Sequence, residues 1–159
     1  SRGHEWSITP NKRTGKDATG CPHCTPQTSR IEIRIFCELK YLFSDIEWRH
    51  KVDGIEVDIY FPKYSIGIEV DGYYWHVNRE EKDKLKGFEL SKRGINLFRL
   101  REDKLRKIDE TGIFFRNNEE ELLIIYRLLR HLLNNVRFDV QDQNEINEYL
   151  KAKSLQNNT

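Results

Sequence analysis

The stretch that decides the fold runs Ile55-Glu56-Val57-Asp58-Ile59-Tyr60-Phe61-Pro62, Lys63-Tyr64-Ser65, Ile66-Gly67-Ile68-Glu69-Val70-Asp71-Gly72. Both apolar runs alternate with the period of a β-strand, and Pro62 with the polar residues after it predicts a tight connection. Pairing the two strands brings Asp58, Glu69 and Asp71 close together. Carboxylates resist burial unless a positive charge lies between them, and hard oxygen ligands favour Mg²⁺. The pattern therefore predicts a divalent-metal site suited to phosphodiester chemistry.

Further elements are predicted on both sides of this hairpin. A capping box, Ser29-Arg30-Ile31-Glu32, starts a helix, and Gly94 ends a charged one. We expect strands at about 46–51 and 95–100, and helices at about 79–93, 119–133 and 143–154. The order helix, hairpin, helix, strand predicts an α/β fold, a mixed sheet flanked by helices. The leucine cluster of the 119–133 helix is expected to be core, or else an interface with a partner. A homodimer is a separate possibility.

Composition limits the class of protein. The 159 residues are 37% hydrophobic and 33% charged, with a net charge of +1 that neither favours nor excludes nucleic acid. No apolar run approaches the ~20 residues that span a bilayer, so no membrane partner is expected. The odd cysteine count (Cys21, Cys24 and Cys37) argues against a disulfide framework and predicts a reducing, intracellular compartment, the cytoplasm.

Each acidic residue also has a plainer interpretation. Asp58 could face solvent on an edge strand, and Glu69 with Asp71 could form a solvated face of theirs. Glu32 is explained by its capping box alone. Asp83 lies in a charge run, which is usually an exposed helix face.

An aromatic run, Tyr73-Tyr74-Trp75, leads from the acidic strand to His76. A lone histidine is more often structural than catalytic, but its pKa suits proton transfer and this one follows an acidic strand. The aromatic side chains could stack on DNA bases or fill the core beneath the site, and we expect Trp75 to do the latter.

Residues 1–28 are loop-rich and predict a small zinc-binding module. Cys21-Pro22-His23-Cys24 suits one knuckle of a zinc site, and His4 could supply a third ligand. A redox pair or a purely structural pair of cysteines is the alternative.

Residues 29–102 resemble the very short patch repair (Vsr-like) branch of the PD-(D/E)XK nuclease superfamily, and related phage homing endonucleases. The matching positions are Glu32, Asp58-Ile59-Tyr60-Phe61-Pro62, Val70-Asp71-Gly72-Tyr73-Tyr74-Trp75-His76, Asp83-Lys84 and Gly94-Ile95-Asn96-Leu97-Phe98-Arg99-Leu100. The superfamily's lysine is replaced here by Asp71, and in this branch a histidine takes over proton transfer. Residues 1–28 resemble part of a zinc-ribbon module.

The resemblance implies a restriction-endonuclease-like core at 29–105, between the zinc module and a C-terminal helical extension at 106–159. It implies a Mg²⁺-dependent endonuclease acting on double-stranded DNA, of homing or restriction type. The residues assigned to catalysis are Glu32, Asp58, Glu69, Asp71, His76 and Asp83. Asp58 would bind the metal with the backbone carbonyl of Val70, helped by Glu69 or Asp71. His76 would exchange a proton with the nucleophile or leaving group.

Side chains that could contact DNA are Tyr73, Tyr74, Lys82, Lys84 and Lys86, the lysines lying on the predicted charged helix. Two alternatives stay open. One is a mismatch-directed nicking repair endonuclease. The other is a non-catalytic, zinc-containing DNA-binding protein on a degenerate nuclease fold.

Overall fold

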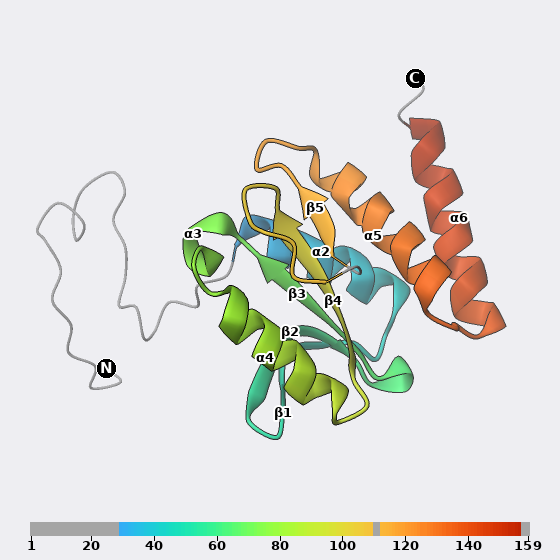
Figure 1. Ribbon diagram of the computed structural model, residues 1–159. Coiled ribbons are helices and arrows are strands. Elements are labelled where there is room, and N and C mark those ends of the chain that lie inside the picture. The colour runs from blue at the N-terminus through green and yellow to red at the C-terminus, as the bar shows by residue number, and fades with distance from the viewer. Residues whose placement is uncertain (1–28, 110–111, 157–159) are drawn as a thin grey trace, which may run out of the picture.

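The computed structural model describes residues 29–109 and 112–156 (Figure 1). The predicted zinc ligands His4, Cys21 and Cys24 lie outside the described residues. The elements are, in order, α2 (Arg30–Leu42), β1 (Glu47–Val52), β2 (Ile55–Phe61), the 3₁₀ turn η1 (Pro62–Tyr64), β3 (Ile66–Asp71), α3 (Tyr73–His76), α4 (Glu80–Ser91), β4 (Asn96–Glu102), β5 (Ile113–Phe115), α5 (Glu121–Asn135) and α6 (Val140–Gln156).

The strands form one mixed sheet in the order β1-β2-β3-β4-β5. The first three strands are antiparallel, and β3, β4 and β5 run parallel. Because the β3–α4–β4 crossover makes β3 and β4 neighbours, Glu69 lies beside Arg99 and Asp71 beside Arg101. The predicted α/β class with a mixed sheet is confirmed.

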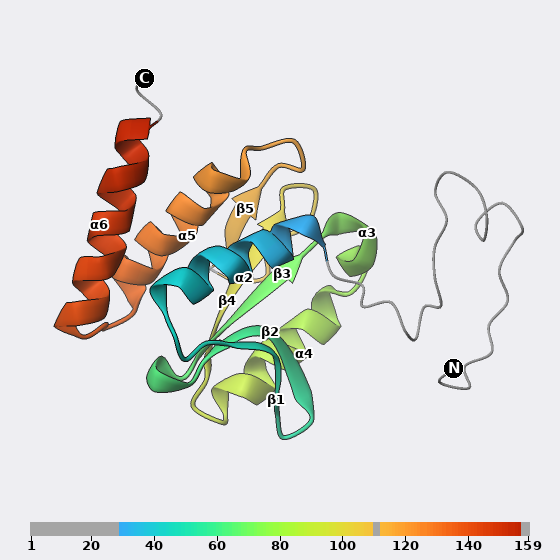
Figure 2. The same ribbon diagram turned by 180° about the vertical axis from the view of Figure 1, so that it is seen from behind.

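Helices cover both faces of the sheet. Helix α4 lies on one face, α2 and α5 lie on the other, and α6 packs outside against α5 and α2 (Figures 1 and 2). Every residue of β3 is consequently buried. The main core, between the sheet and the α2–α5 layer, also takes in Ile146 and Tyr149 of α6, whereas a smaller cluster around Val57 and Leu90 lies beneath α4.

Local sequence signals explain where most elements begin and end. The Ser29 hydroxyl accepts the Glu32 N–H at 3.1 Å, which completes the predicted capping box. Gly94 follows α4 with a φ of 75°, a left-handed conformation that glycine adopts without strain. The predicted elements are confirmed, with shifts of a few residues at their ends. Strand β5 and helix α3 were not predicted.

The turn after β2 fastens α6 to the core. The Tyr64 hydroxyl donates to the Asp142 carboxylate, and Lys63 Nζ lies 2.9 Å from the same group and 2.5 Å from Asp139. In the part of the chain that the structure describes, no helix is long and apolar enough to cross a membrane.

Candidate active site

Strands β2 and β3 separate just where the acidic residues lie. Their pairing runs only from Ile59–Ile68 to Phe61–Ile66. Beyond it Asp58 Oδ2 accepts the Val70 N–H at 2.9 Å, and the Asp58 N–H donates to Glu69 Oε1 at 3.2 Å. Side chains thus replace the strand-to-strand hydrogen bonds, which holds two carboxylates side by side at the opening between the strands.

A cleft of about 480 Å³ opens at this point. It is lined by Ser29, Glu32, Arg49, Glu56, Asp58, Glu69, Val70, Gly72, Trp75, His76, Arg79 and Lys86. Four of the six residues predicted for catalysis therefore meet in one hollow. The other two, Asp71 and Asp83, are buried behind it.

Glu69 is an unusually placed acid, with 3% of its surface exposed. Its Oε2 lies 2.5 Å from Lys86 Nζ. Burial raises the pKa of Glu69 to about 7, the charge of Asp58 adds to the rise, and Lys86 and Arg99 oppose it. Burial also raises the pKa of Asp58. Both shifts follow mainly from burial, which disfavours the charged carboxylate, and hard oxygen donors of this kind fit a divalent cation such as Mg²⁺.

Asp71, fully buried, already has its positive charge. Arg99 Nη1 lies 3.1 and 2.9 Å from its two oxygens, and Arg101 Nη1 donates to it as well. Arg99 Nη2 also donates to the Asp83 backbone carbonyl at 2.8 Å. Two guanidinium groups from β4 therefore balance the charge of this carboxylate inside the protein.

His76 stands between the two buried aspartates. Its Nδ1 lies 3.1 Å from Asp83 Oδ2 and 3.3 Å from Asp71 Oδ1. Burial alone would lower the pKa of His76, but the hydrogen bond to Asp83 and the charges of Asp71, Asp83 and Glu69 raise it above its ordinary value. Burial would raise the pKa of Asp83, yet His76, Arg99 and Arg101 hold it below its usual range. Two carboxylates thus favour the charged imidazolium.

The same three residues could hold a metal ion, since one ligand atom from each of Asp71, His76 and Asp83 lies within 4.8 Å of the others. Arg101 Nη1, however, lies 3.4 Å from Asp83 Oδ2 and also bonds Asp71. A cation placed among these three would have to share its ligands with bound guanidinium groups. In the Asp58–Glu69 pair a lysine, Lys86, is bound to Glu69, but within the described residues no cationic side chain is hydrogen-bonded to Asp58, which makes this pair the better-suited site.

Glu32 performs its capping role and also faces the cleft. Its Oε2 accepts the Ser29 N–H at 3.3 Å, and its Oε1 lies 3.4 Å from Arg49 Nε. Burial, and next the charge of Asp58, raise the pKa of Glu32. Glu32 therefore caps helix α2 and lines the cleft at the same time.

The expectation that Trp75 fills the core is wrong. Its exposed fraction is 45%, against 39% for Tyr73 and 78% for Tyr74. The strand ends at Asp71, and the aromatic run forms the short helix α3, which projects from the sheet instead of continuing into the core. Trp75 alone among the three lines the cleft.

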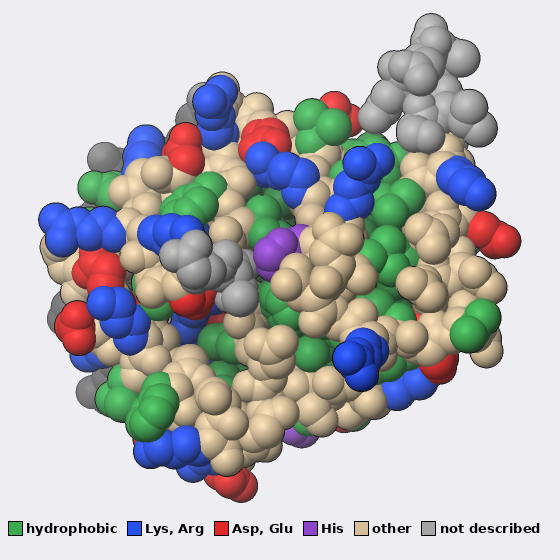
Figure 3. Space-filling model, turned by 45° about the vertical axis from the view of Figure 1, so that its right-hand side comes forward, with side chains coloured by type: hydrophobic (Ala, Val, Ile, Leu, Met, Phe, Trp, Pro, Cys, Tyr) green, Lys and Arg blue, Asp and Glu red, His purple; other side chains and the backbone are tan. Residues whose placement is uncertain are grey.

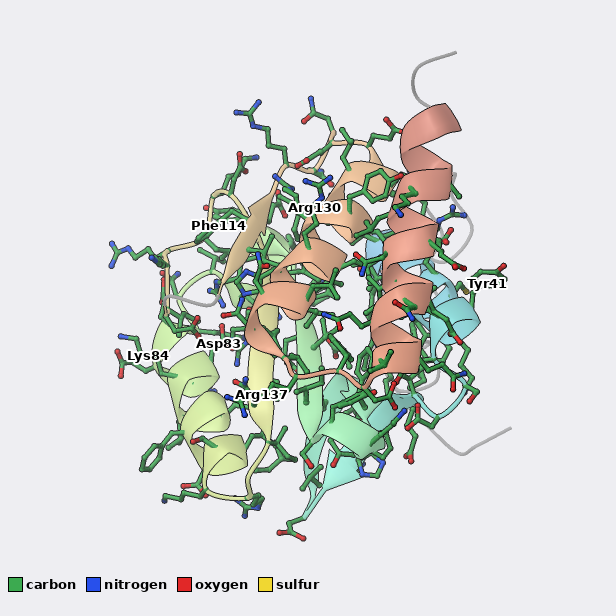
Figure 4. The ribbon with its side chains drawn as sticks, turned by 90° about the vertical axis from the view of Figure 1, so that its right-hand side faces the viewer. Tyr41, Asp83, Lys84, Phe114, Arg130 and Arg137 are labelled. Carbon is green, nitrogen blue, oxygen red and sulfur yellow. The ribbon has the colours of Figure 1, made fainter. Side chains whose placement is uncertain are left out.

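The three predicted DNA-contacting lysines of α4 differ in position. Lys86 lies in the cleft, whereas Lys84 is exposed, 3.7 Å from Glu81, and Lys82 is exposed too. Figure 4 shows neighbouring residues of this helix turned opposite ways, Asp83 towards the sheet and Lys84 away from it. On the face in Figure 3, Lys and Arg side chains are spread out rather than gathered in one patch.

Sequence reasoning missed four arginines: Arg49, Arg79, Arg99 and Arg101. A signal for the last two was present, because Arg99 and Arg101 alternate with apolar residues on their strand, with the spacing of Glu69 and Asp71. Matching two i, i+2 pairs of opposite charge on neighbouring strands would have paired them.

Comparison with known proteins adds no relative: no family model, no curated protein and no solved structure matches the chain. The geometry of the cleft is therefore the basis for assigning a function.

Proposed function

We propose that this protein is a Mg²⁺-dependent endonuclease that hydrolyses phosphodiester bonds of double-stranded DNA at a specific site. One observation carries the proposal. Two carboxylates with raised pKa values, Asp58 and Glu69, stand side by side in an open cleft that also contains a histidine held by two further carboxylates.

The donor set fits the metal. Asp58 uses one carboxylate oxygen for the Val70 N–H, and no hydrogen bond to its other oxygen is formed within the described residues. Asp58, Glu69 and the Val70 carbonyl would hold Mg²⁺ through oxygen atoms alone, as this ion prefers. When bound, the ion would polarise the scissile phosphate and lower the pKa of a bound water.

His76 supplies the proton transfer. Its Nδ1 is bonded to Asp83, so Nε2 is the ring nitrogen left to exchange a proton with the attacking water or the leaving oxygen. Asp83 and Asp71 fix the ring and favour its charged form, which suits proton donation to the leaving oxygen. Glu32 reaches the same cleft and would orient a water.

The activity is tested on supercoiled plasmid DNA incubated with the purified chain in Mg²⁺ or in EDTA. We expect nicked or linear DNA with Mg²⁺ alone, with ends that a ligase can rejoin, since by resemblance the products carry 5′-phosphate and 3′-hydroxyl groups. If the protein binds DNA but cleaves neither the plasmid nor mismatched duplexes, the enzyme proposal is wrong and a DNA-binding module takes its place.

A further inference from the structure

Arg49 occupies a position that local structure disfavours. It lies within strand β1 with a φ of 48°, a left-handed conformation in which the β-carbon crowds the backbone of any residue except glycine. Trp48 pairs with Ile59 and His50 with Val57, but Arg49 and Asp58, which lie between them, are not paired. Backbone strain of this kind tends to persist at functional sites.

Arg79 is misplaced for a different reason. It is the N-cap of α4, where serine, threonine, aspartate and asparagine are preferred, and its side chain forms no capping hydrogen bond. A positive charge at this end of a helix is also repelled by the helix dipole. The first turn is otherwise acidic, with Glu80, Glu81 and Asp83.

Both arginines line the same cleft. Among residues 29–109 and 112–156, Arg49 reaches only Glu32, at 3.4 and 3.5 Å, the long limit for a hydrogen bond. The guanidinium of Arg79 is exposed and has no hydrogen-bond or ion-pair partner in the described part of the chain. Arg49 and Arg79, which local structure disfavours, thus line one cleft with guanidinium donors that are not fully used. Departures from local sequence rules are expected at functional sites.

Charge explains what these donors are for. Glu32, Glu56, Asp58 and Glu69 give the cleft four carboxylates, and Lys86 lies 2.5 Å from one of them, Glu69. A cleft of that charge would repel a phosphate backbone. Guanidinium groups bind phosphate through two parallel hydrogen bonds and, unlike an ammonium group, hold it in a fixed orientation.

We infer that Arg49 and Arg79 form a clamp that binds backbone phosphates of the DNA strand in the cleft. This inference rests on the proposed function for its ligand, DNA. It adds two residues that bind substrate and sets the strand's position between β1 and the start of α4.

The test is the affinity for a short fluorescent DNA duplex, measured by anisotropy over a range of salt concentrations with Ca²⁺ in place of Mg²⁺. Arg79→Asn should weaken binding about tenfold or more, as expected for a charge-assisted hydrogen bond. It should lower the slope of log affinity against log salt by about 0.9, the value for one phosphate contact. Its thermal midpoint should equal or exceed that of the wild type, because asparagine is a good N-cap. Arg49→Gln should weaken binding similarly.

Lys51→Gln is the matched control, since Lys51 lies on β1, is exposed and is outside the cleft, and it should bind as the wild type does. The clamp is overturned if Arg79→Asn and Arg49→Gln bind with wild-type affinity and slope, or if the wild type does not bind the duplex. If the plasmid stays intact while both variants lose affinity, the clamp stands and the nuclease falls. If the variants cleave and bind normally, only the clamp falls.

Discussion

At the scale of single residues, the acids of the candidate site differ in what balances their charge. Asp71 is bound by Arg99 and Arg101, and Glu69 by Lys86. Asp58 accepts a hydrogen bond from a backbone N–H, and within the described residues no side chain donates to it. Asp58 is therefore the carboxylate with most to gain from a cation, which is why the proposed metal site is centred on it.

The same reasoning predicts how metal affinity depends on pH. Burial raises the pKa of Glu69 to about 7, so below that pH a proton competes with the metal for its oxygens. Mg²⁺ affinity should rise about tenfold per pH unit below pH 7 and level off above it. Calorimetric titration at several pH values measures this. Affinity that is flat between pH 5 and about 8 would show that Glu69 is not a ligand.

Asp83 should set the pH range of activity through His76. Because Asp83 raises the pKa of His76, Asp83→Asn should lower it, and the ring should lose its proton at a lower pH than in the wild type. The limb of the pH–rate profile that belongs to His76 should move to lower pH. Nuclear magnetic resonance titration of the ring gives an independent measure. A profile that moves to higher pH, or a ring pKa that stays the same, contradicts this role.

At the scale of elements, the sequence predicts those that are long enough to show a repeating pattern of apolar residues. Strands β2 and β3 alternate over six or seven residues with a turn between them, which is why their bounds are matched. Strand β5 has three residues and α3 four, too few for any periodicity. The positions of β5 and α3 are determined by contacts with the rest of the fold instead of by a local sequence pattern. Because α3 was not predicted, the exposure of Trp75, which lies on it, was not predicted either.

The site itself was predicted in part. Carboxylates are unusual in an apolar strand, so Asp58, Glu69 and Asp71 could be identified from the sequence as candidate site residues. The matching spacing of Arg99 and Arg101 was a signal for their partners, but the register that brings Arg99 to Asp71 is not stated by the sequence. Arg49 has no local signal, since nothing in the sequence around it indicates its left-handed backbone conformation.

Close packing between elements predicts a sharp effect at Gly67. A β-carbon there would lie 2.7 Å from Val57 Cγ1 and 3.0 Å from Leu97 Cδ1. Gly67→Ala should therefore lower the free energy of unfolding by about 1–3 kcal/mol, as overpacking does. The control is Gly87→Ala on α4, where nothing lies within 4 Å and alanine should stabilise the helix by up to about 1 kcal/mol. Urea denaturation compares them, and equal effects would refute the packing argument.

At the scale of the whole molecule, the C-terminal helices share the core of the sheet. Leu128, Leu129 and Leu132 of α5 are fully buried in the same cluster as Ile59 and Ile68. The leucine-rich helix thus buries against the core, one of the two outcomes expected for it. The geometry of the cleft then depends on an intact C-terminal part, because the sheet that carries Asp58 packs against it.

That dependence is measurable. Leu132→Ala should lower the free energy of unfolding by about 2–5 kcal/mol, the usual cost of a cavity in a core. Leu123→Ala is the matched control on the same helix, 42% exposed, and should cost far less. Chemical denaturation of both variants should show a single transition for the described domain. A Leu132→Ala variant as stable as the control would mean that α5 contributes little to this core.

The most direct test of the central claim is the rate of Mg²⁺-dependent plasmid cleavage by wild type and Asp58→Ala, side by side. Loss of the metal ligand should lower the rate by about 10³-fold or more, because a bound ion contributes several kcal/mol of transition-state stabilisation. DNA binding should be kept or strengthened, since a negative charge is removed. Asp45→Ala, an exposed acid outside the cleft, should cleave normally. Cleavage by Asp58→Ala at the wild-type rate would contradict the assignment of this cleft as a metal-dependent nuclease site.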